Sequence, residues 1–545
     1  MNSQKEELLK ELIRSRVIVT DSERSIVTPN GDQAAWLFDF RRIFFTPEGL
    51  SLAADIFWER FESQYPFQVA GLEASALPLV TAIVMRGLER GKKVNGFFIR
   101  KSRNKSGLLN MVEGLPAGEK VILVDDLINK GSSFLRQIKI LQEAGMPIHA
   151  LFAFVRYRKP SYYQFAYDAG VKLETVFSLQ DFDRPLLEDE NTALLSDIFA
   201  PRWRWHADKP NYFYVVPKSA PTLDETNVYV GSDSGYMWAL SQTDGSVVWK
   251  YKIKGFGNKG KTILSSPLVY KGVVYFGAYD GNVYALDIKT GEEKWVYMDA
   301  DWVGSSPCVS TDHGLLYIGV EFGLFRKHGG VVALNASTGK KVWEAHFPGL
   351  THASPIYSRK YKMVVVGSND FIVTAVVAKT GAVLWKTPTG AEVRGGGAFD
   401  EKRGYVAFGS FDGKVYILSV QNGEVVFSYQ TGGPVYSTPY IEGDFLYVGS
   451  TDKRVYCFNL EKLDLQWSFE TSARVFASPL VVEGKVYIGS NDGRFYELDS
   501  KTGVSSGFFQ CTERVTNKAA YNAKTKHFFL PTFANEIFCL TRRFS

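Results

Sequence analysis

The stretch VYFGAYDGNVYALDIKTGEEKW, residues 274–295, alternates apolar and polar side chains around two short breaks rich in glycine and charged residues. Alternation of this kind predicts β-strands, and the breaks predict tight turns between them. The same template recurs at residues 228–249 and 486–503. The template therefore describes a repeated unit of antiparallel strands.

One glycine of this template gives the size and the number of the units. Its equivalents are Gly231, Gly277, Gly319, Gly367, Gly409, Gly449 and Gly489, at successive steps of 46, 42, 48, 42, 40 and 40 residues. A period of about 40–45 residues with four strands per unit is typical of β-propeller blades. Seven clear units and a degenerate one near the end of the sequence predict eight blades.

The blades need side chains that fill the gaps between them and a strand that closes the ring. Large aromatic residues recur at one position and suit the gaps; they are Trp249, Trp295, Trp343, Trp385 and Trp467, with Phe427 in one copy. The degenerate unit holds only three strands. We expect residues 201–216 to supply the fourth and so remove the open sheet edge.

Residues before about 200 have a different pattern. Helical periods alternate there with short apolar runs, such as residues 120–124 and 149–155, which predicts βαβ units around a largely parallel sheet. We therefore expect an α/β domain at residues 1–200 and an all-β, eight-bladed propeller at residues 201–545.

The overall composition narrows the class of protein. Of 545 residues, 45% are hydrophobic and 22% charged, the net charge is +5, and no apolar run approaches 18 residues. These values exclude a disordered chain and a helical membrane protein, and no secretory signal or basic run is visible, so we expect a cytoplasmic protein without nucleic-acid or membrane partners. The cysteines lie outside metal-binding spacings and are expected to be reduced core thiols: Cys308, Cys457, Cys511 and Cys539.

The segment KVILVDDLINKGSSF, residues 120–134, carries the clearest chemical signal. A buried strand ends in Asp125 and Asp126, and a turn with Gly131 then opens a helix. Backbone N–H groups at a helix N-terminus suit a phosphate, and paired carboxylates suit vicinal hydroxyls. The segment predicts a cradle for a ribose 5-phosphate, although the same residues taken alone also fit an ordinary helix cap.

Further segments extend this pattern in a fixed order. They are FDFRRIFFTPEGL, VAGLEASALPL, FIRKSRNKSG and VDDLINKGSS, starting at residues 38, 69, 98 and 124. In these motifs residues 1–200 resemble the type I phosphoribosyltransferases of the orotate phosphoribosyltransferase family. The resemblance implies an enzyme that takes phosphoribosyl pyrophosphate (PRPP) together with Mg²⁺, and a homodimer formed through this domain.

The resemblance also implies roles for individual residues. Catalysis falls to Asp125, Asp126, Arg103 and Lys105. The 5-phosphate site comprises Asn129, Lys130, Gly131, Ser132 and Ser133. The pyrophosphate site comprises Glu73, Ala74, Ser75, Arg100 and Lys101. Asn30 and Arg156 are the expected acceptor contacts, although Arg156 also suits a pair with a surface acid.

Departures from the family pattern bear on the acceptor and on catalysis. Pro29 replaces a lysine that contacts orotate, and Asn104 and Ser106 replace the lysine and histidine of the catalytic loop. We therefore expect a PRPP-dependent transferase acting on an acceptor other than orotate, with the propeller recognising the acceptor or a protein partner. The alternatives are a catalytically silent PRPP or nucleotide sensor, a scaffold whose propeller docks partners, and a true orotate phosphoribosyltransferase.

Residues 205–545 resemble propellers with pyrroloquinoline-quinone-type repeats, including the scaffold of the outer-membrane barrel assembly machine. The chain lacks the adjacent cysteine pair of quinoprotein dehydrogenases, so we do not expect the quinone. Residues just before each innermost strand are expected at one mouth of the channel; they are Leu264, Gly304, His352, Arg394, Tyr436, Phe476 and Thr516. Among them His352, Arg394, Tyr436 and Phe476 suit an anionic or planar ligand, although such residues also line channels that bind nothing.

Overall fold

The structure is a computed structural model that describes residues 4–20, 36–73, 76–100, 110–187, 198–207, 218–255, 262–323 and 328–543. The chain divides into two compact units, residues 1–196 and 197–545. Among the residues described, no helix combines the length and the apolar character that crossing a membrane requires.

A six-stranded sheet forms the centre of the N-terminal unit. Its order is β5-β4-β3-β6-β7-β8, and all neighbours are parallel except β4 and β5. The strands are β3 (Gln68–Leu72), β4 (Gly96–Ile99), β5 (Val112–Gly114), β6 (Val121–Ile128), β7 (Ile148–Arg156) and β8 (Lys172–Ser178). A separate pair comprises β1 (Ile18–Thr20) and β2 (Trp36–Phe38). The predicted α/β fold with a largely parallel sheet is confirmed.

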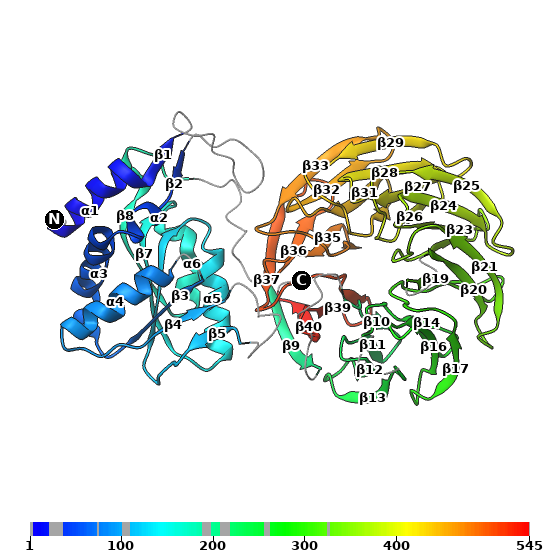
Figure 1. The fold of residues 1–545 in the computed structure, drawn as a ribbon, viewed down its shortest axis with the longest axis horizontal. Helices are drawn as coiled ribbons and strands as arrows, with labels where there is room; N and C mark the ends of the chain where they lie inside the picture. The colour runs from blue at the N-terminus through cyan, green and yellow to red at the C-terminus, as the bar shows by residue number, and fades with distance from the viewer. Residues whose placement is uncertain are drawn as a thin grey trace. The chain divides into compact units, whose positions relative to one another are not determined.

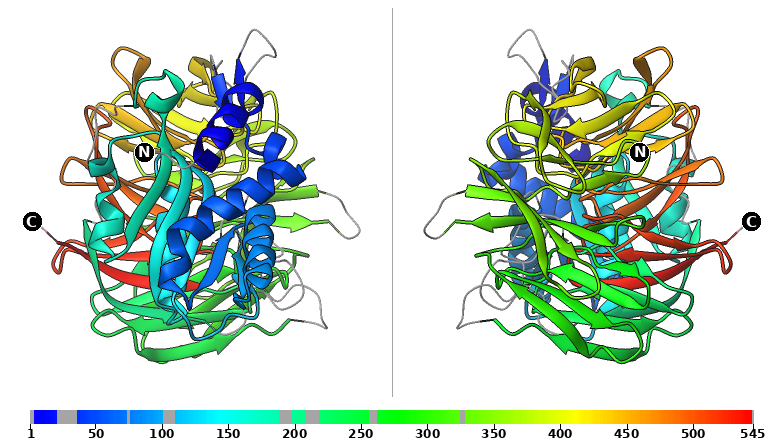
Figure 2. Two further views of the ribbon diagram at one scale, coloured as in Figure 1. Left: turned by 90° about the vertical axis from the view of Figure 1, so that its left-hand side faces the viewer. Right: turned by 90° about the vertical axis from the view of Figure 1, so that its right-hand side faces the viewer.

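Helices cover both faces of this sheet (Figure 1; Figure 2, left). They are α1 (Gln4–Leu12), α2 (Arg41–Phe44), α3 (Pro47–Phe61), α4 (Leu77–Glu89), α5 (Ser132–Glu143) and α6 (Gln164–Asp168), with a π-helical turn at Ile13–Val17 and 3₁₀ turns at Glu62–Gln64, Pro160–Tyr163 and Leu179–Phe182. Thr46 caps α3, since its Oγ1 accepts a hydrogen bond from the Gly49 N–H at 3.2 Å. Phe57 and Trp58 of α3 pack into one apolar core with Phe152 of the sheet.

Eight sheets of four strands form the C-terminal unit, arranged in a ring (Figure 1). Blade 1 comprises β10 (Thr222–Leu223), β11 (Asn227–Gly231), β12 (Tyr236–Ser241) and β13 (Val247–Lys252). Blade 2 comprises β14 (Leu268–Tyr270), β15 (Val273–Gly277), β16 (Asn282–Asp287) and β17 (Glu293–Met298). Blade 3 comprises β18 (Cys308–Ser310), β19 (Leu315–Phe322), β20 (His328–Asn335) and β21 (Lys341–Phe347). Blade 4 comprises β22 (Ile356–Ser358), β23 (Met363–Gly367), β24 (Ile372–Val377) and β25 (Val383–Pro388).

The second half of the ring repeats this antiparallel order. Blade 5 comprises β26 (Ala398–Asp400), β27 (Tyr405–Gly409), β28 (Lys414–Ser419) and β29 (Val425–Gln430). Blade 6 comprises β30 (Tyr440–Glu442), β31 (Phe445–Gly449), β32 (Arg454–Asn459) and β33 (Asp464–Glu470). Blade 7 comprises β34 (Leu480–Val482), β35 (Lys485–Gly489), β36 (Arg494–Asp499) and β37 (Ser505–Gln510). Blade 8 comprises β38 (Ala520–Asn522), β39 (His527–Pro531), β40 (Glu536–Arg542) and, from before blade 1, β9 (Phe199–His206). The predicted eight-bladed propeller is confirmed.

The repeated residues of the sequence lie where blades meet. Each of the five repeated tryptophans donates its indole N–H to a backbone carbonyl of the next blade, as Trp343 does to Ala378 at 3.0 Å. The periodic glycine marks a close approach to the next blade, because a Cβ at Gly409 would lie 2.3 Å from Val435 Cγ1. Blade 7 differs: Gly507 stands at the tryptophan position, and the buried Glu497 opposite it pairs with Arg542 at 2.9 Å.

The four cysteines carry no disulfide. Cys457, Cys511 and Cys539 are buried, as expected of core thiols. Cys308 is partly buried, and it packs against the apolar cluster that contains Tyr317 and Trp343, so it lies at the border of the core.

Candidate functional site

The residues with predicted roles in the N-terminal unit meet at the carboxyl edge of its parallel strands. Register pairs Leu72 of β3 with Ile99 of β4, and Gly71 with Val124 of β6. The residues that follow, Glu73, Arg100 and Asp125, therefore stand side by side at the strand ends. In open α/β sheets this edge is where ligands bind.

Asp125 and Asp126 lie near the end of β6. Asp125 is 7% exposed, and its Oδ1 accepts the backbone N–H of Asp126 at 3.0 Å. The Asp126 Oδ1 accepts the Leu127 N–H at 2.8 Å. Burial raises the pKa of the Asp126 carboxyl above its ordinary value, and the negative charge of Asp39 raises it further. A carboxylate held in this way is stabilised by positive charge that develops next to it.

The predicted 5-phosphate loop leads directly into α5. Gly131 has φ +74°, and a Cβ there would meet the ring of Phe165 at 2.5 Å, so both the backbone conformation and the space require glycine. The N-cap residue of α5 is Gly131, which has no side chain to cap the helix, so the first N–H groups of α5 suit an anion. Asn129, Lys130 and Ser132 are half-buried and Ser133 is exposed.

A second group of residues, which the sequence did not predict, forms hydrogen bonds with this loop and with the end of β6. The Arg158 side chain is 3% exposed, and its Nε donates to Asn129 Oδ1 at 3.2 Å. The Tyr163 hydroxyl donates to the carbonyl of Ile128 at 3.0 Å, and burial raises the pKa of this tyrosine to about 12. Arg158 follows Arg156 by two residues in the sequence, so the AFVRYRK run was the available signal.

Asp39 and Arg41 add charge beside the carboxylate pair. Arg41 Nε lies 2.6 Å from Asp39 Oδ1, and this contact raises the pKa of Arg41. The negative charge of Asp126 raises it further. Both residues belong to the FDFRR segment, for which the sequence analysis proposed no chemical role.

The pyrophosphate candidates that the structure describes also lie together. Arg100 Nη2 is 3.5 Å from Glu73 Oε2, and its Nη1 is 3.6 Å from Glu113 Oε1. Arg156 ends β7, and its Nη1 donates to the carbonyl of Arg158 at 2.8 Å. No carboxylate in the described ranges forms an ion pair with Arg156. The other candidates lie outside the described residues: Asn30, Ala74, Ser75, Lys101, Arg103 and Lys105.

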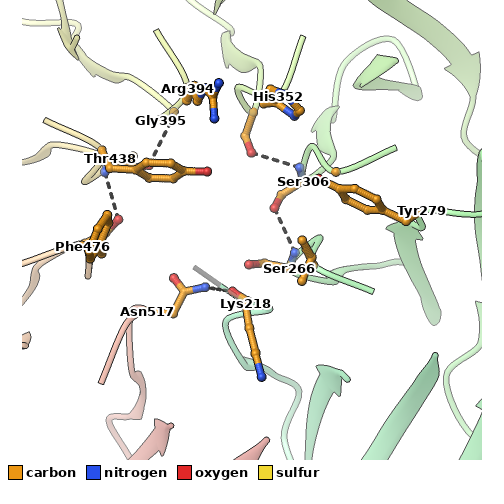
Figure 3. A pocket seen from close by; sticks show the side chains of 16 residues that line it. Lys218, Ser266, Tyr279, Ser306, His352, Arg394, Gly395, Thr438, Phe476 and Asn517 are labelled. Atoms are coloured by element: carbon orange, nitrogen blue, oxygen red, sulfur yellow. Dashed lines mark hydrogen bonds between the residues drawn. The ribbon is translucent and has the colours of Figure 1, made fainter. Parts of the chain in front are cut away.

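The propeller channel holds a pocket of about 250 Å³ (Figure 3). Its lining includes the predicted mouth residues Leu264, Gly304, His352, Arg394, Tyr436 and Phe476. Thr516 is buried, and Asn517 lines the pocket in its place. Lys218 also lines the pocket and occupies the equivalent position of blade 1 in the sequence KSAP, which the sequence analysis overlooked.

Every basic side chain of this pocket has a carboxylate beside it. Arg394 Nε lies 2.6 Å from Glu392 Oε2, and His352 Nδ1 lies 2.8 Å from Glu321 Oε1. The ammonium of Lys218 points away from the channel (Figure 3) and lies 2.5 Å from Asp233 Oδ2. The positive charges that suggested an anion site are therefore largely compensated.

Hydroxyl groups form a partial ring around the channel (Figure 3). A backbone N–H of one blade donates to a serine or threonine hydroxyl of the next, at 2.9–3.0 Å. The donor and acceptor pairs are Ala220 to Ser266, Ser266 to Ser306, Ser306 to Ser354, Gly396 to Thr438 and Thr438 to Ser478. The hydroxyl is missing in blades 1, 5 and 8, where the equivalent residues are Ala220, Gly396 and Lys518.

Metal-binding geometry gives no further site. No group of three or more histidine, cysteine or acidic residues arranged to hold a metal ion occurs among the residues that the structure describes. Carboxylates such as Asp125 and Asp126 suit a Mg²⁺ ion that enters with a phosphorylated substrate.

Over its N-terminal part the chain is similar to orotate phosphoribosyltransferases. It is 26% identical to that of Bradyrhizobium sp. (strain ORS 278) over 179 residues, which cover 32% of this chain and 95% of the relative. It is 30% identical to that of Pyrococcus furiosus over 154 residues, which cover 28% of this chain and 80% of the relative.

The propeller matches the family model described as outer membrane protein assembly factor BamB, over residues 200–367, 299–438 and 369–507. The crystal structure of BamB from Moraxella catarrhalis is similar to 64% of this chain over 99% of its own length, with a TM-score of 0.51 and 17% identity. At this identity the likeness shows the fold alone.

Proposed function

Since the chain belongs to the orotate phosphoribosyltransferase family through its N-terminal unit, and through its propeller to the family described as outer membrane protein assembly factor BamB, we propose that it is a PRPP-dependent transferase. Its acceptor is a compound other than orotate, and the propeller recognises that acceptor or a protein partner. One observation carries the proposal. Asp125 and Asp126 lie at the same sheet edge as the start of α5, which Gly131 precedes.

The proposed reaction breaks the bond between C1 of the ribose and the pyrophosphate oxygen. The acceptor nucleophile forms the new bond to C1, and pyrophosphate leaves with its Mg²⁺. Positive charge that develops at C1 is stabilised by the carboxylates of Asp125 and Asp126, which also accept hydrogen bonds from the ribose hydroxyls. The N–H groups that follow Gly131 hold the 5-phosphate, and Arg100 attracts the pyrophosphate.

Two residues bear on the acceptor. Pro29 provides neither a charge nor an N–H where the family has an orotate-binding lysine, which supports a different acceptor. Arg156 stands at the end of β7, one strand from Asp125, and carries a guanidinium without an ionic partner among the described residues. We propose that Arg156 binds an acidic group of the acceptor.

The test is calorimetric titration of the full chain with Mg-PRPP, combined with an assay for pyrophosphate release in the presence of orotate and of a mixed pool of nitrogen heterocycles. We expect binding that the double variant Asp125→Asn/Asp126→Asn loses, and release with an acceptor other than orotate. A matched control is Asp168→Asn, which alters a carboxylate at the end of α6. Absence of Mg-PRPP binding by the unaltered chain would contradict the proposal.

A second candidate is a PRPP sensor without transferase activity. It is favoured by Asn104 and Ser106, which stand at the lysine and histidine positions of the family's catalytic loop. Binding of Mg-PRPP without pyrophosphate release for any acceptor in the pool supports this candidate. In either case we propose a homodimer through the N-terminal unit, which sedimentation of the full chain measures directly.

A further inference from the structure

A second cavity, of about 660 Å³, lies in the propeller channel. It shares five hydroxyl-bearing residues with the pocket of Figure 3, so the two spaces meet at the partial hydroxyl ring. The shared residues are Ser266, Ser306, Ser354, Thr438 and Ser478. A volume of this size is within the range of small-molecule sites.

Lys518 is the only charged residue among the described residues that line this cavity. It precedes β38 and stands where blades 2, 3, 4, 6 and 7 carry serine or threonine. Its Nζ lies 4.7 Å from the centre of the Tyr440 ring, which belongs to blade 6. The side chain therefore reaches past blade 7 into the channel.

The charge of Lys518 is not compensated within the part of the chain that the structure describes, since no carboxylate there forms an ion pair with it. Burial lowers the pKa of this amine below its ordinary value, and no carboxylate of the described residues counteracts the effect. This distinguishes Lys518 from Arg394, His352 and Lys218, each of which has an acidic partner. A half-buried ammonium without a counter-ion favours an anion from outside the chain.

The hydroxyl ring supplies further donors beside this ammonium. Each of its five hydroxyls already accepts a backbone N–H, and within the described ranges none of them donates a hydrogen bond to another residue. A hydroxyl has one proton to donate, and so these protons are available to acceptors in the channel. One ammonium and adjacent O–H donors match the two oxygens of a carboxylate.

The remaining lining suits an apolar, planar body. Tyr440 and Tyr521 present aromatic rings, and the other large side chains there are aliphatic: Leu223, Ile356, Leu480, Val481 and Val482. A single positive charge next to such surfaces balances one negative charge, whereas a phosphate monoester carries nearly two at neutral pH.

We propose that the propeller channel is a binding site for an aromatic monocarboxylate, whose carboxylate pairs with Lys518 and the hydroxyl ring and whose ring packs on Tyr440. The site includes none of the predicted PRPP residues, and the proposal concerns binding alone. It therefore stands whether or not the N-terminal unit transfers a phosphoribosyl group.

The test is calorimetric titration of the full chain with benzoate, and with benzamide, acetate and phenyl phosphate as comparison compounds. We expect saturable binding of benzoate with a dissociation constant of about 1 mM or lower. Benzamide lacks the charge, acetate lacks the ring, and phenyl phosphate carries excess charge, so each is expected to bind at least about tenfold more weakly. Equal or tighter binding of any of them, or no binding of benzoate, would overturn the proposal.

Lys518→Ser is the decisive variant, because it gives blade 8 the serine that blades 2, 3, 4 and 7 carry at this position and so is expected to preserve the fold. We expect it to weaken benzoate binding at least about tenfold, while the control Lys524→Ser, at an exposed turn of the same blade, leaves it unchanged. Unaltered benzoate affinity in Lys518→Ser would overturn the assignment. Titration with Mg-PRPP in the same preparations reports separately on the N-terminal unit.

Chemical labelling gives a second readout that needs no variant. Acetic anhydride acetylates lysine amines that it can reach, and Lys518 borders the cavity that the carboxylate would fill. Benzoate is expected to slow acetylation at Lys518 and not at Lys524, as measured by mass spectrometry of peptides. Equal protection of both lysines, or of neither, would count against the site.

Discussion

The indole N–H of Trp203 donates to the carbonyl oxygen of Gln242 at 3.0 Å. Trp203 belongs to β9, which precedes the propeller repeats in sequence, and Gln242 belongs to blade 1. Cys539 of β40 faces Trp203 in the same register in which Ala239 faces Trp249 in blade 1. The segment ahead of the first repeat therefore contributes an aromatic closure equivalent to those between the other blades.

We expect Trp203→Ala to destabilise the propeller by about 2–4 kcal/mol, because it removes the hydrogen bond and the ring against which Gly245 packs. The measurement is urea unfolding followed by near-ultraviolet circular dichroism. Trp203→Phe is the matched control, since Phe427 holds the same position in blade 5, and its cost is expected to be about 1 kcal/mol. Equal stability of the alanine variant and the unaltered chain would show that closure does not depend on this contact.

We expect Asp126→Asn to raise the thermal unfolding midpoint of the N-terminal unit at pH 7 while weakening Mg-PRPP binding at least about tenfold. Burial raises the pKa of this carboxyl in the folded state, so the folded state binds the proton more tightly than the unfolded state does. Keeping the group ionised at pH 7 thus costs stability, and the cost disappears as the pH falls through the raised pKa toward the ordinary value of about 3.9.

The pH dependence of this stability difference tests the prediction. The negative charge of Asp39 raises the pKa of Asp126, whereas the positive charge of Arg41, which pairs with Asp39, favours the ionised form of Asp126. The stability difference between Asp126→Asn and the unaltered chain should therefore shrink between pH 7 and pH 4, as followed by scanning calorimetry. A difference that stays constant with pH would mean that the gain comes from something other than the buried charge.

We expect Gly131→Ala to abolish detectable Mg-PRPP binding and to lower stability by about 1–3 kcal/mol. The new methyl group meets the Phe165 ring, and alanine is strained at φ +74°. Gly145→Ala is the matched control, because it also has a positive φ, +69°, but open space around the added Cβ. Calorimetric titration of both variants separates backbone strain from collision at the loop.

Local structure follows directly from sequence where the residues concerned are neighbours in the chain or recur at a fixed period. The Asp125 to Ser133 segment encodes a strand, a loop and a helix start in one run, so the placement of its groups follows from local structure. The glycine period revealed the blades because each of these glycines faces the next blade at a distance that excludes a Cβ.

Residues brought to the site from other elements escaped prediction. Arg158 lies in the loop after β7 and donates a hydrogen bond to Asn129 in the loop after β6, a contact between segments that are distant in sequence. Lys218 holds the blade 1 position of the mouth residues, although it precedes the first clear copy of the repeat, which starts at residue 228. The charge compensation of Arg394 and His352 depends on Glu392 and Glu321, which the spacing of the repeats does not reveal.

Finally, we expect Lys518→Ser to stabilise the propeller in the absence of ligand. The new hydroxyl can accept the Ser478 N–H and extend the ring by a hydrogen bond worth about 0.5–1.5 kcal/mol. Removal of the buried ammonium adds to this gain, since the lowered pKa of Lys518 means that charging it costs stability below that pKa. That part of the gain should fade as the pH rises toward the ordinary lysine value of about 10.4, where the amine of the unaltered chain is neutral. Tyr440, which faces the amine, has a pKa that burial raises, so it stays neutral over most of this range.

Adding benzoate should stabilise the unaltered chain and leave the variant unchanged, because only a folded state that binds the anion gains from it. Thermal unfolding of both proteins with and without benzoate measures the two effects together, and a variant less stable than the unaltered chain would contradict the assignment of Lys518 as a residue kept for binding at the expense of stability.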